Sequence, residues 1–278
     1  MTGAYKIRAA HNVLRSLPAE RRRRGVVVAS SGNFAQAFAF AGARSGVPIV
    51  VAMLDTTSPF KVEATRGLGA EVVFCGTDAL ARQAAVERVA AERAMVAVDF
   101  FEERPIIAGH ASLGLEILED DPGVEQILVP VSSGGLAAGI ATAVKLTRPG
   151  VKVIGVQPER ANAYYRSHAA GRPVAIDDWE SIADGLSARR PGEFPFRHLE
   201  AYLDDVVLVP EVAIARAFRT ILFRAKLLAE PAGAVAAAAF LAAAAPGVDP
   251  ARRTVALLSG GNVAAPMVSR MLEMAGGE

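Results

Sequence analysis

The sequence predicts an α/β fold built on parallel sheets. Short apolar runs rich in β-branched residues alternate with longer helical patterns along nearly the whole chain. These runs are almost continuously apolar, which is typical of strands that are covered on both faces of a parallel sheet. Alternation of strands and helices at this spacing indicates β-α-β units.

Each expected element follows from its own stretch of sequence. We expect strands at residues 26–29, 49–54, 71–74, 95–99, 126–131, 152–156, 206–209 and 254–258. Helical patterns lie between them, among others at residues 35–44, 59–68, 79–93 and 136–146. Residues 232–245 are mostly alanine and fall short of the roughly 20 apolar residues that a membrane span needs. We therefore expect a close-packed buried helix there.

Composition narrows the class of protein. The chain has 278 residues, with 30 basic and 29 acidic side chains, so a protein that coats nucleic acid is disfavoured. The run Arg21–Arg24 is expected to be a solvated turn between a helix and a strand. A single cysteine, Cys75, allows no internal disulfide and fits a reducing compartment. The first residues, MTGAYKIR, contain no apolar signal segment. We expect a cytoplasmic protein that binds neither nucleic acid nor membrane.

Three loops that follow expected strands are candidates for ligand binding. They read SSGN at 30–33, SSGG at 132–135 and SGGN at 259–262, and the first two open helical patterns. Small residues at a helix N-terminus suit an anion, a carboxylate at the first loop and a phosphate at the second. Ordinary capped helix starts or tight glycine turns remain alternatives for each loop. The four histidines show no metal-ligand spacing.

Taken together, eight segments in order resemble one family. They are GAYKIRAA, ASSGNFAQA, KVEATRGLGAEVV, IIAGHASLGLEIL, VPVSSGGLAAGIA, SIADGLSARRPGE, AEPAGAVAAA and LLSGGN. The chain resembles the serine/threonine dehydratases (threonine ammonia-lyases) and serine racemases, which are fold-type II enzymes dependent on pyridoxal 5'-phosphate (PLP). The resemblance implies two three-layer α/β domains of the tryptophan synthase β-like class. Residues 25–103 would form the small domain, and residues 1–24 with 104–278 the large one.

The resemblance also assigns roles to residues near the start of the chain. Lys6 matches the lysine that forms a Schiff base with the cofactor, and Tyr5 matches an aromatic residue that packs on its ring. Ser30, Ser31, Gly32 and Asn33 match the loop that holds the substrate carboxylate, with Asn33 also reaching the phenolic oxygen of the cofactor.

Further roles fall on the later loops. The phosphate cradle would be formed by Ser132, Ser133, Gly134, Gly135 and Leu136. Ser259 matches the residue that hydrogen-bonds the pyridine nitrogen, with Glu230 nearby, and His110 lies on the substrate side.

The implied reaction is β-elimination from L-serine, L-threonine or a related 3-hydroxy amino acid, giving a 2-oxo acid and ammonia. Lys6 would be the base at Cα, and the cofactor would act as electron sink. Serine racemisation on the same scaffold is an alternative that needs a second acid/base, for which Ser31 is the candidate. A non-catalytic truncated paralogue is another. The resemblance further implies a homodimer and a small amino-acid substrate.

The sequence departs from the family pattern at several places. Phe34 replaces a histidine, and His110 and Ser112 replace glutamine and threonine, so the amino acid used stays open. Racemase-like members bind a cation through Glu-Pro-x-x-Ala-x-Asp, but residues 157–163 read QPERANA here. Since both carboxylates are missing, we expect no metal. A few dozen residues usually precede the lysine motif, so a misplaced start or a degraded paralogue is expected.

Overall fold

The computed structural model describes residues 2–99, 102–242 and 247–276. Contacts divide the chain into two units, Met1–Gly109 and His110–Glu278. The boundary falls within one helix, α6 (Arg104–Asp120). Residues 1–24 are grouped with the first unit here. Their expected assignment to the larger domain stays a prediction.

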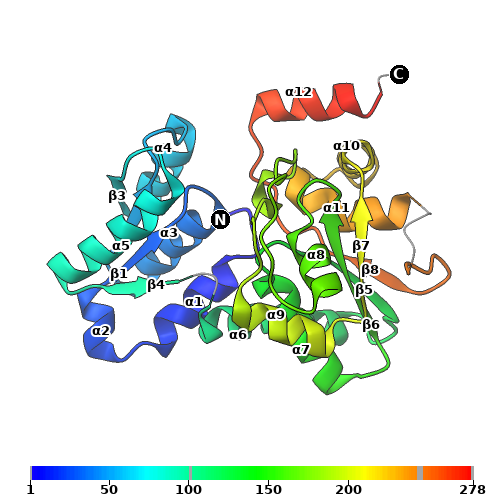
Figure 1. Cartoon of the computed structure of the whole chain (residues 1–278), viewed down its shortest axis with the longest axis horizontal. Helices are drawn as coiled ribbons and strands as arrows, with labels where there is room; N and C mark the ends of the chain where they lie inside the picture. Colours follow the sequence, from blue (N-terminus) through cyan, green and yellow to red (C-terminus); the bar gives the residue numbers. More distant parts are fainter. Residues whose placement is uncertain (1, 100–101, 243–246, 277–278) are drawn as a thin grey trace. The chain divides into compact units, whose positions relative to one another are not determined.

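The first unit is a parallel four-stranded sheet with helices on both faces (Figure 1). The strand order is β3-β2-β1-β4, and β1 pairs with β2 from Val26↔Ile49 to Ala29↔Ala52. The elements in chain order are α1 (Ile7–Ser16), α2 (Ala19–Arg24), β1 (Val26–Ala29), α3 (Asn33–Ser45), β2 (Ile49–Met53), α4 (Pro59–Gly67), β3 (Glu71–Phe74), α5 (Ala79–Arg93) and β4 (Val96–Val98).

Alternate residues of the central strands feed two separate apolar layers. Val26 and Val28 point into a cluster with α1 and α3, whereas Val27 joins Val86 and Val89 of α5 on the other face. This arrangement explains why the strand sequences are apolar at every position.

The arginine run forms part of a helix, so the expected turn is wrong. Arg21–Arg24 make up the last four residues of α2, and the chain turns only at Gly25, whose φ is +92°. Basic side chains near a helix C-terminus interact favourably with the helix dipole, which accounts for the run continuing the helix. No residue of α2 is buried.

The second unit contains another parallel sheet, with strand order β7-β6-β5-β8 (Figure 1). After α6 its elements are β5 (Gln126–Pro130), α7 (Gly135–Thr147), β6 (Lys152–Pro158), α8 (Ala163–Ala170), the 3₁₀ turn η1 (Asp184–Leu186), α9 (Glu193–Tyr202), β7 (Asp205–Val209), α10 (Glu211–Thr220), the π-helical turn η2 (Ile221–Ala225), α11 (Pro231–Leu241), β8 (Thr254–Ala256) and α12 (Ala265–Met274).

Helix α11 lies in the core of this unit. Every residue from Pro231 to Ala239 is buried, and the helix packs against α10 and the sheet. The expected helix is confirmed up to Leu241 and its burial up to Ala239, while residues 243–246 lie outside the described residues. Helix α12 packs on α10 (Figure 1).

All eight expected strands are present, and their ends differ by no more than two residues from those expected. The largest extension is that of β6, which continues to Pro158. The four helical patterns are also confirmed. Within the described residues, no helix is both long and apolar enough to cross a membrane.

Candidate active site

Lys6 lies at the N-terminal end of α1. It has helical backbone angles as the N-cap residue, and its Nζ sits 4.3 Å from the centre of the Tyr5 ring. The helix that follows buries Ala9, Ala10 and Val13 against α3. The lysine is thus carried by a helix that is fixed in the core of the first unit, with its side chain only partly buried.

The loop at residues 30–33 connects β1 to α3. The Gly32 backbone N–H donates to Ser30 Oγ at 3.2 Å, and Gly32 is the N-cap of α3. A Cβ placed on Gly32 would meet no described atom within 4 Å, so the space above this residue is open. A helix N-terminus beside open space suits a carboxylate.

Phe34 turns away from this loop. It is buried in the core of the first unit, with its ring centre 4.7 Å from that of Phe38. Its aromatic ring therefore contributes to packing of α3, while Asn33 at the first position of the helix remains at the loop.

The loop at residues 132–136 connects β5 to α7 in the second unit. Gly134 is the N-cap residue, with φ +105°, a conformation that favours glycine. A Cβ there would approach Pro195 Cβ to 2.9 Å and Leu199 Cδ1 to 3.0 Å. Glycine is thus required both by the backbone and by the close packing of α9.

Backbone groups of a distant segment hold the two serines. Ser132 Oγ accepts from the Ala188 N–H at 3.3 Å, and the Ser133 carbonyl accepts from the Gly192 N–H at 3.0 Å. Ala188 and Gly192 could not be predicted for this role from the sequence, because every non-proline residue carries a backbone donor. A loop fixed in this way at a helix N-terminus is suited to a phosphate.

Glu230 and Ser259 lie in adjoining segments of the second unit. The Glu230 N–H donates to the Gly260 carbonyl at 2.9 Å. Gly233 allows this approach, since a Cβ on it would lie 2.3 Å from Gly260 O. Both Glu230 and Ser259 are buried, at 8% and 5% exposure. Because β5 and β8 are parallel neighbours, Ser259 and the loop 132–136 both follow the carboxyl ends of these strands, at the same edge of the sheet.

The second unit also includes His110, which is buried on α6 with 3% exposure. The predicted residues therefore fall in two groups. Tyr5, Lys6 and the loop 30–33 belong to the first unit, and His110, the loop 132–136, Glu230 and Ser259 belong to the second.

The turn after β6 is held by amide side chains. Gln157 is fully buried and hydrogen-bonded on both sides of its amide, and Asn162 Nδ2 donates to the Glu159 carbonyl at 2.8 Å. Among the described residues, no three His, Cys, Asp or Glu side chains gather as metal ligands. These amide groups do not supply the charged oxygens that a hard cation prefers.

A buried tyrosine anchors the same region. Tyr164 donates to Glu200 Oε1 at 2.9 Å, joining α8 to α9. Burial of this side chain, and then the Glu200 charge, raise the pKa of the Tyr164 hydroxyl above its usual range. The hydroxyl therefore stays protonated and acts as a donor.

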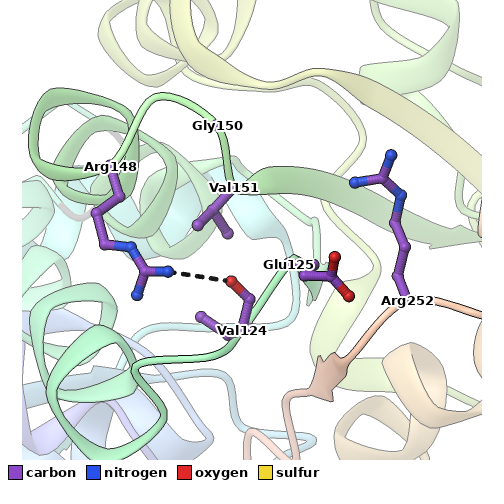
Figure 2. Close-up of a pocket in the computed structure, with 6 residues that line it drawn as sticks. All are labelled: Val124, Glu125, Arg148, Gly150, Val151 and Arg252. Carbon is purple, nitrogen blue, oxygen red and sulfur yellow. Dashed lines mark hydrogen bonds between the residues drawn. The ribbon is translucent and has the colours of Figure 1, made fainter.

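Two cavities lie away from these loops. Figure 2 shows one of about 230 Å³ at the amino ends of β5 and β6, where Arg148 Nη2 donates to the Val124 carbonyl at 3.4 Å. Ligands of open α/β sheets bind at the opposite, carboxyl ends. Cys75 lines a second cavity, but it donates to Met53 O at 3.1 Å. Burial raises the pKa of its thiol, which disfavours a role as nucleophile.

The residues present fit PLP. A glycine loop in which a Cβ would clash begins α7, and the buried hydroxyl of Ser259 follows β8 of the same sheet. The buried carboxyl of Glu230 lies in the segment that adjoins Gly260. A lysine is available at the start of α1. The model of the pyridoxal-phosphate dependent enzyme family matches residues 1–260. The chain therefore belongs to this family.

Several relatives indicate a particular branch of it. The chain is 42% identical over 272 residues to an L-threonine ammonia-lyase of Geobacter sulfurreducens, covering 98% of this chain and 67% of that protein. Its fold is similar to that of a processed threonine deaminase isoform 2 from Solanum lycopersicum, with TM-score 0.93, 29% identity and coverage of 99% and 80%. Maize serine racemase has TM-score 0.90 at 30% identity, with coverage of 98% and 83%. The expected fold-type II architecture is confirmed.

Proposed function

We propose that this chain is a PLP-dependent ammonia-lyase that eliminates the β-hydroxyl of L-threonine, L-serine or a related 3-hydroxy amino acid. The product is a 2-oxo acid, released with ammonia. The observation that carries the proposal is the presence of a core-anchored lysine and two loops of small residues, each beginning a helix after a strand. The relatives named threonine ammonia-lyase support it.

Different residues of this chain would bind the cofactor, bind the substrate and transfer the proton. Backbone N–H groups of Ser132–Leu136 hold the cofactor phosphate, and Ser259 holds the pyridine nitrogen. The loop 30–33 binds the substrate carboxylate. PLP, when bound, supplies the electron sink. The Lys6 amine accepts the Cα proton, and the β-hydroxyl leaves with a proton as water. The unsaturated amine released then hydrolyses to the 2-oxo acid and ammonia.

Ser259 has a consequence for the reaction type. A hydroxyl cannot stabilise a protonated pyridine as a carboxylate would, so the ring nitrogen should remain neutral. A neutral ring is a moderate electron sink, which favours rapid elimination over transamination.

The assay is direct. With PLP and L-threonine or L-serine, we expect equal amounts of 2-oxo acid and ammonia to form, because each elimination releases one of each. The 2-oxo acid is measured with a hydrazine reagent and the ammonia enzymatically, with D-threonine as the control substrate. A protein that binds PLP but converts neither substrate would be the non-catalytic paralogue instead.

Serine racemisation is a second candidate, favoured by the likeness to maize serine racemase and by Ser31 in the carboxylate loop. It requires an acid/base on the face opposite Lys6. We expect Ser31→Ala to lower racemisation by about 100-fold, since a positioned proton donor contributes that much. Elimination should remain measurable. Chiral chromatography separates the D-amino acid from the 2-oxo acid, and equal losses of both products would contradict this role of Ser31.

The assembly and location are also proposals. We infer a homodimer and a cytoplasmic location, supported by the resemblance to the dehydratases and by the single cysteine. We also propose that residues 25–103 act as the small domain and that residues 1–24 with 104–278 act as the large, PLP-binding domain. Light scattering measures the molar mass of the protein in solution, which should be twice that of one chain.

A further inference from the structure

Gln157 is a buried side chain whose amide makes three hydrogen bonds. Its Nε2 donates to the Val131 carbonyl at 3.2 Å and to the Ala161 carbonyl at 3.3 Å. Its Oε1 accepts from the Tyr165 N–H at 2.8 Å. With no exposed surface, this amide cannot exchange these partners for water.

One of these contacts concerns the loop at 132–136. Val131 directly precedes Ser132, and its own N–H donates to the Val156 carbonyl of β6 at 2.9 Å. Both backbone polar groups of Val131 are therefore bound by β6: the N–H by the Val156 carbonyl and the carbonyl by the Gln157 side chain. The direction in which the chain leaves β5 toward the loop thus depends on Gln157.

The remaining contacts tie the same amide to the turn after β6. The amide N–H₂ lies between two carbonyl oxygens of separate segments, those of Val131 and Ala161. Two facing oxygens can be bridged by a hydrogen-bond donor with two protons or by a hard cation. In this chain the donor is present, so no cation is needed to hold the turn and the loop together.

We propose that Gln157 is a positioning residue for the loop 132–136, and that its amide makes cofactor binding in this chain independent of a divalent cation. The proposal rests on the proposed function, because it takes that loop as the phosphate site.

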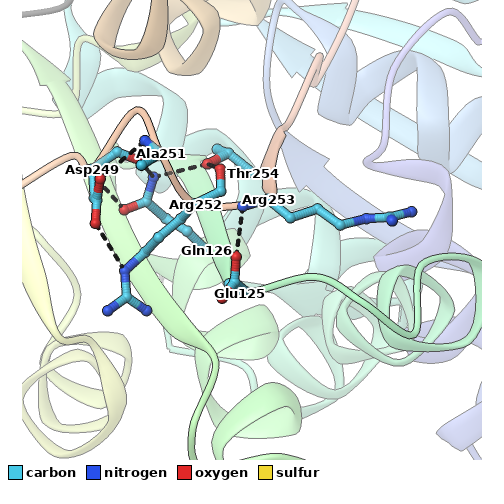
Figure 3. A network of polar contacts seen from close by, with 7 residues as sticks. All are labelled: Glu125, Gln126, Asp249, Ala251, Arg252, Arg253 and Thr254. Carbon is cyan, nitrogen blue, oxygen red and sulfur yellow. Dashed lines mark hydrogen bonds and ion pairs between the residues drawn. The ribbon is translucent and has the colours of Figure 1, made fainter.

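The same strand pair offers a matched control. Gln126 is equally buried at the start of β5, and its Nε2 donates to Thr254 Oγ1 at 3.0 Å and to the Asp249 carbonyl at 3.4 Å. Its Oε1 accepts from the Asp249 N–H at 3.2 Å (Figure 3). Gln126 thus has the same side chain, burial and number of partners, but it lies at the other end of β5 from the loop.

The experiment compares Gln157→Met with Gln126→Met in the full chain. Methionine keeps the size of the side chain and removes its donors. PLP is removed, and its dissociation constant is then measured by titration, with the melting temperature of the cofactor-free protein recorded beside it. We expect both variants to melt earlier, and only Gln157→Met to bind PLP about tenfold more weakly, because its free carbonyls leave the loop poorly held. Equal affinities in the two variants would overturn the proposal.

A second variant tests cation independence. Gln157→Glu places a carboxylate beside the two carbonyl oxygens, which repel it unless a cation intervenes. We expect PLP affinity of this variant to fall and to recover with millimolar Mg²⁺ or Ca²⁺, while the unmodified chain binds PLP equally with and without EDTA. Loss of affinity in the unmodified chain upon chelation, or a variant indifferent to cations, would contradict the proposal.

Failure of the proposed function gives a different result. If the unmodified chain binds no PLP, both proposals fail. If it binds PLP and produces 2-oxo acid, but the two methionine variants behave alike, only the role of Gln157 is wrong.

Discussion

Lys6→Ala should abolish the visible absorbance of the lysine-bound cofactor and lower 2-oxo acid formation by about 1,000-fold or more. The reason is that the same amine holds the cofactor and accepts the Cα proton. The fold should change little, since Lys6 makes no side-chain capping hydrogen bond to α1. Absorbance spectra, steady-state rates and melting temperature measure the three effects.

Two comparisons make this result specific. Lys152→Ala removes an exposed lysine at the start of β6 and should leave spectrum and rate unchanged. Lys6→Ala should still retain some PLP through the loop at 132–136, detectable by its phosphorus resonance. A visible band that persists in Lys6→Ala would show that another lysine holds the cofactor.

Gly134→Ala should destabilise the protein and weaken PLP binding together. A Cβ at this residue meets Pro195 and Leu199 at 3.0 Å or less, and the φ of +105° is unfavourable for alanine. We expect the free energy of unfolding to fall by about 2–4 kcal/mol, the sum of a backbone and an overpacking penalty. Urea denaturation measures it, and PLP titration of the remaining folded protein should show weaker affinity.

Two other glycines separate these causes. Gly171 has φ +64° but open space around a Cβ, so Gly171→Ala should cost about 1 kcal/mol from the backbone alone. Gly150 has neither a positive φ nor a close neighbour, so Gly150→Ala should be nearly neutral or slightly stabilising. PLP affinity should be unchanged in both. If Gly134→Ala resembles Gly171→Ala in stability and affinity, close packing of α9 does not shape the loop.

The strands could be predicted because burial on both faces leaves a direct signal in sequence. Val26, Val27 and Val28 are apolar although they point alternately into two layers. The loops at 30–33 and 132–136 could be located because each joins an expected strand to an expected helix through small residues, which suit an anion at a helix N-terminus. Their assignment to PLP, however, came from the resemblance of eight ordered segments and not from any one loop.

The contacts that fix the loops could not be predicted in this way. Ala188 and Gly192 bind the two serines through their backbone N–H groups. Ala188 and Ser132 are 56 residues apart in the sequence. Gln157 stands where racemase-like members have a glutamate that binds a cation, and only the structure shows which groups its amide binds. The arginine run was misread because charge alone does not distinguish the end of a helix from a turn.

Helix α11 gives a physical reason for the low complexity of its own sequence. From Pro231 to Ala239 all its residues are buried, and Gly233 meets the backbone of the segment after Ser259. A larger side chain on any side would push against α10, the sheet or that segment. The small volume available at these buried positions thus favours alanine and glycine. We expect random substitution libraries to tolerate few residues larger than valine between Pro231 and Ala239, although this sequence resembles a simple repeat.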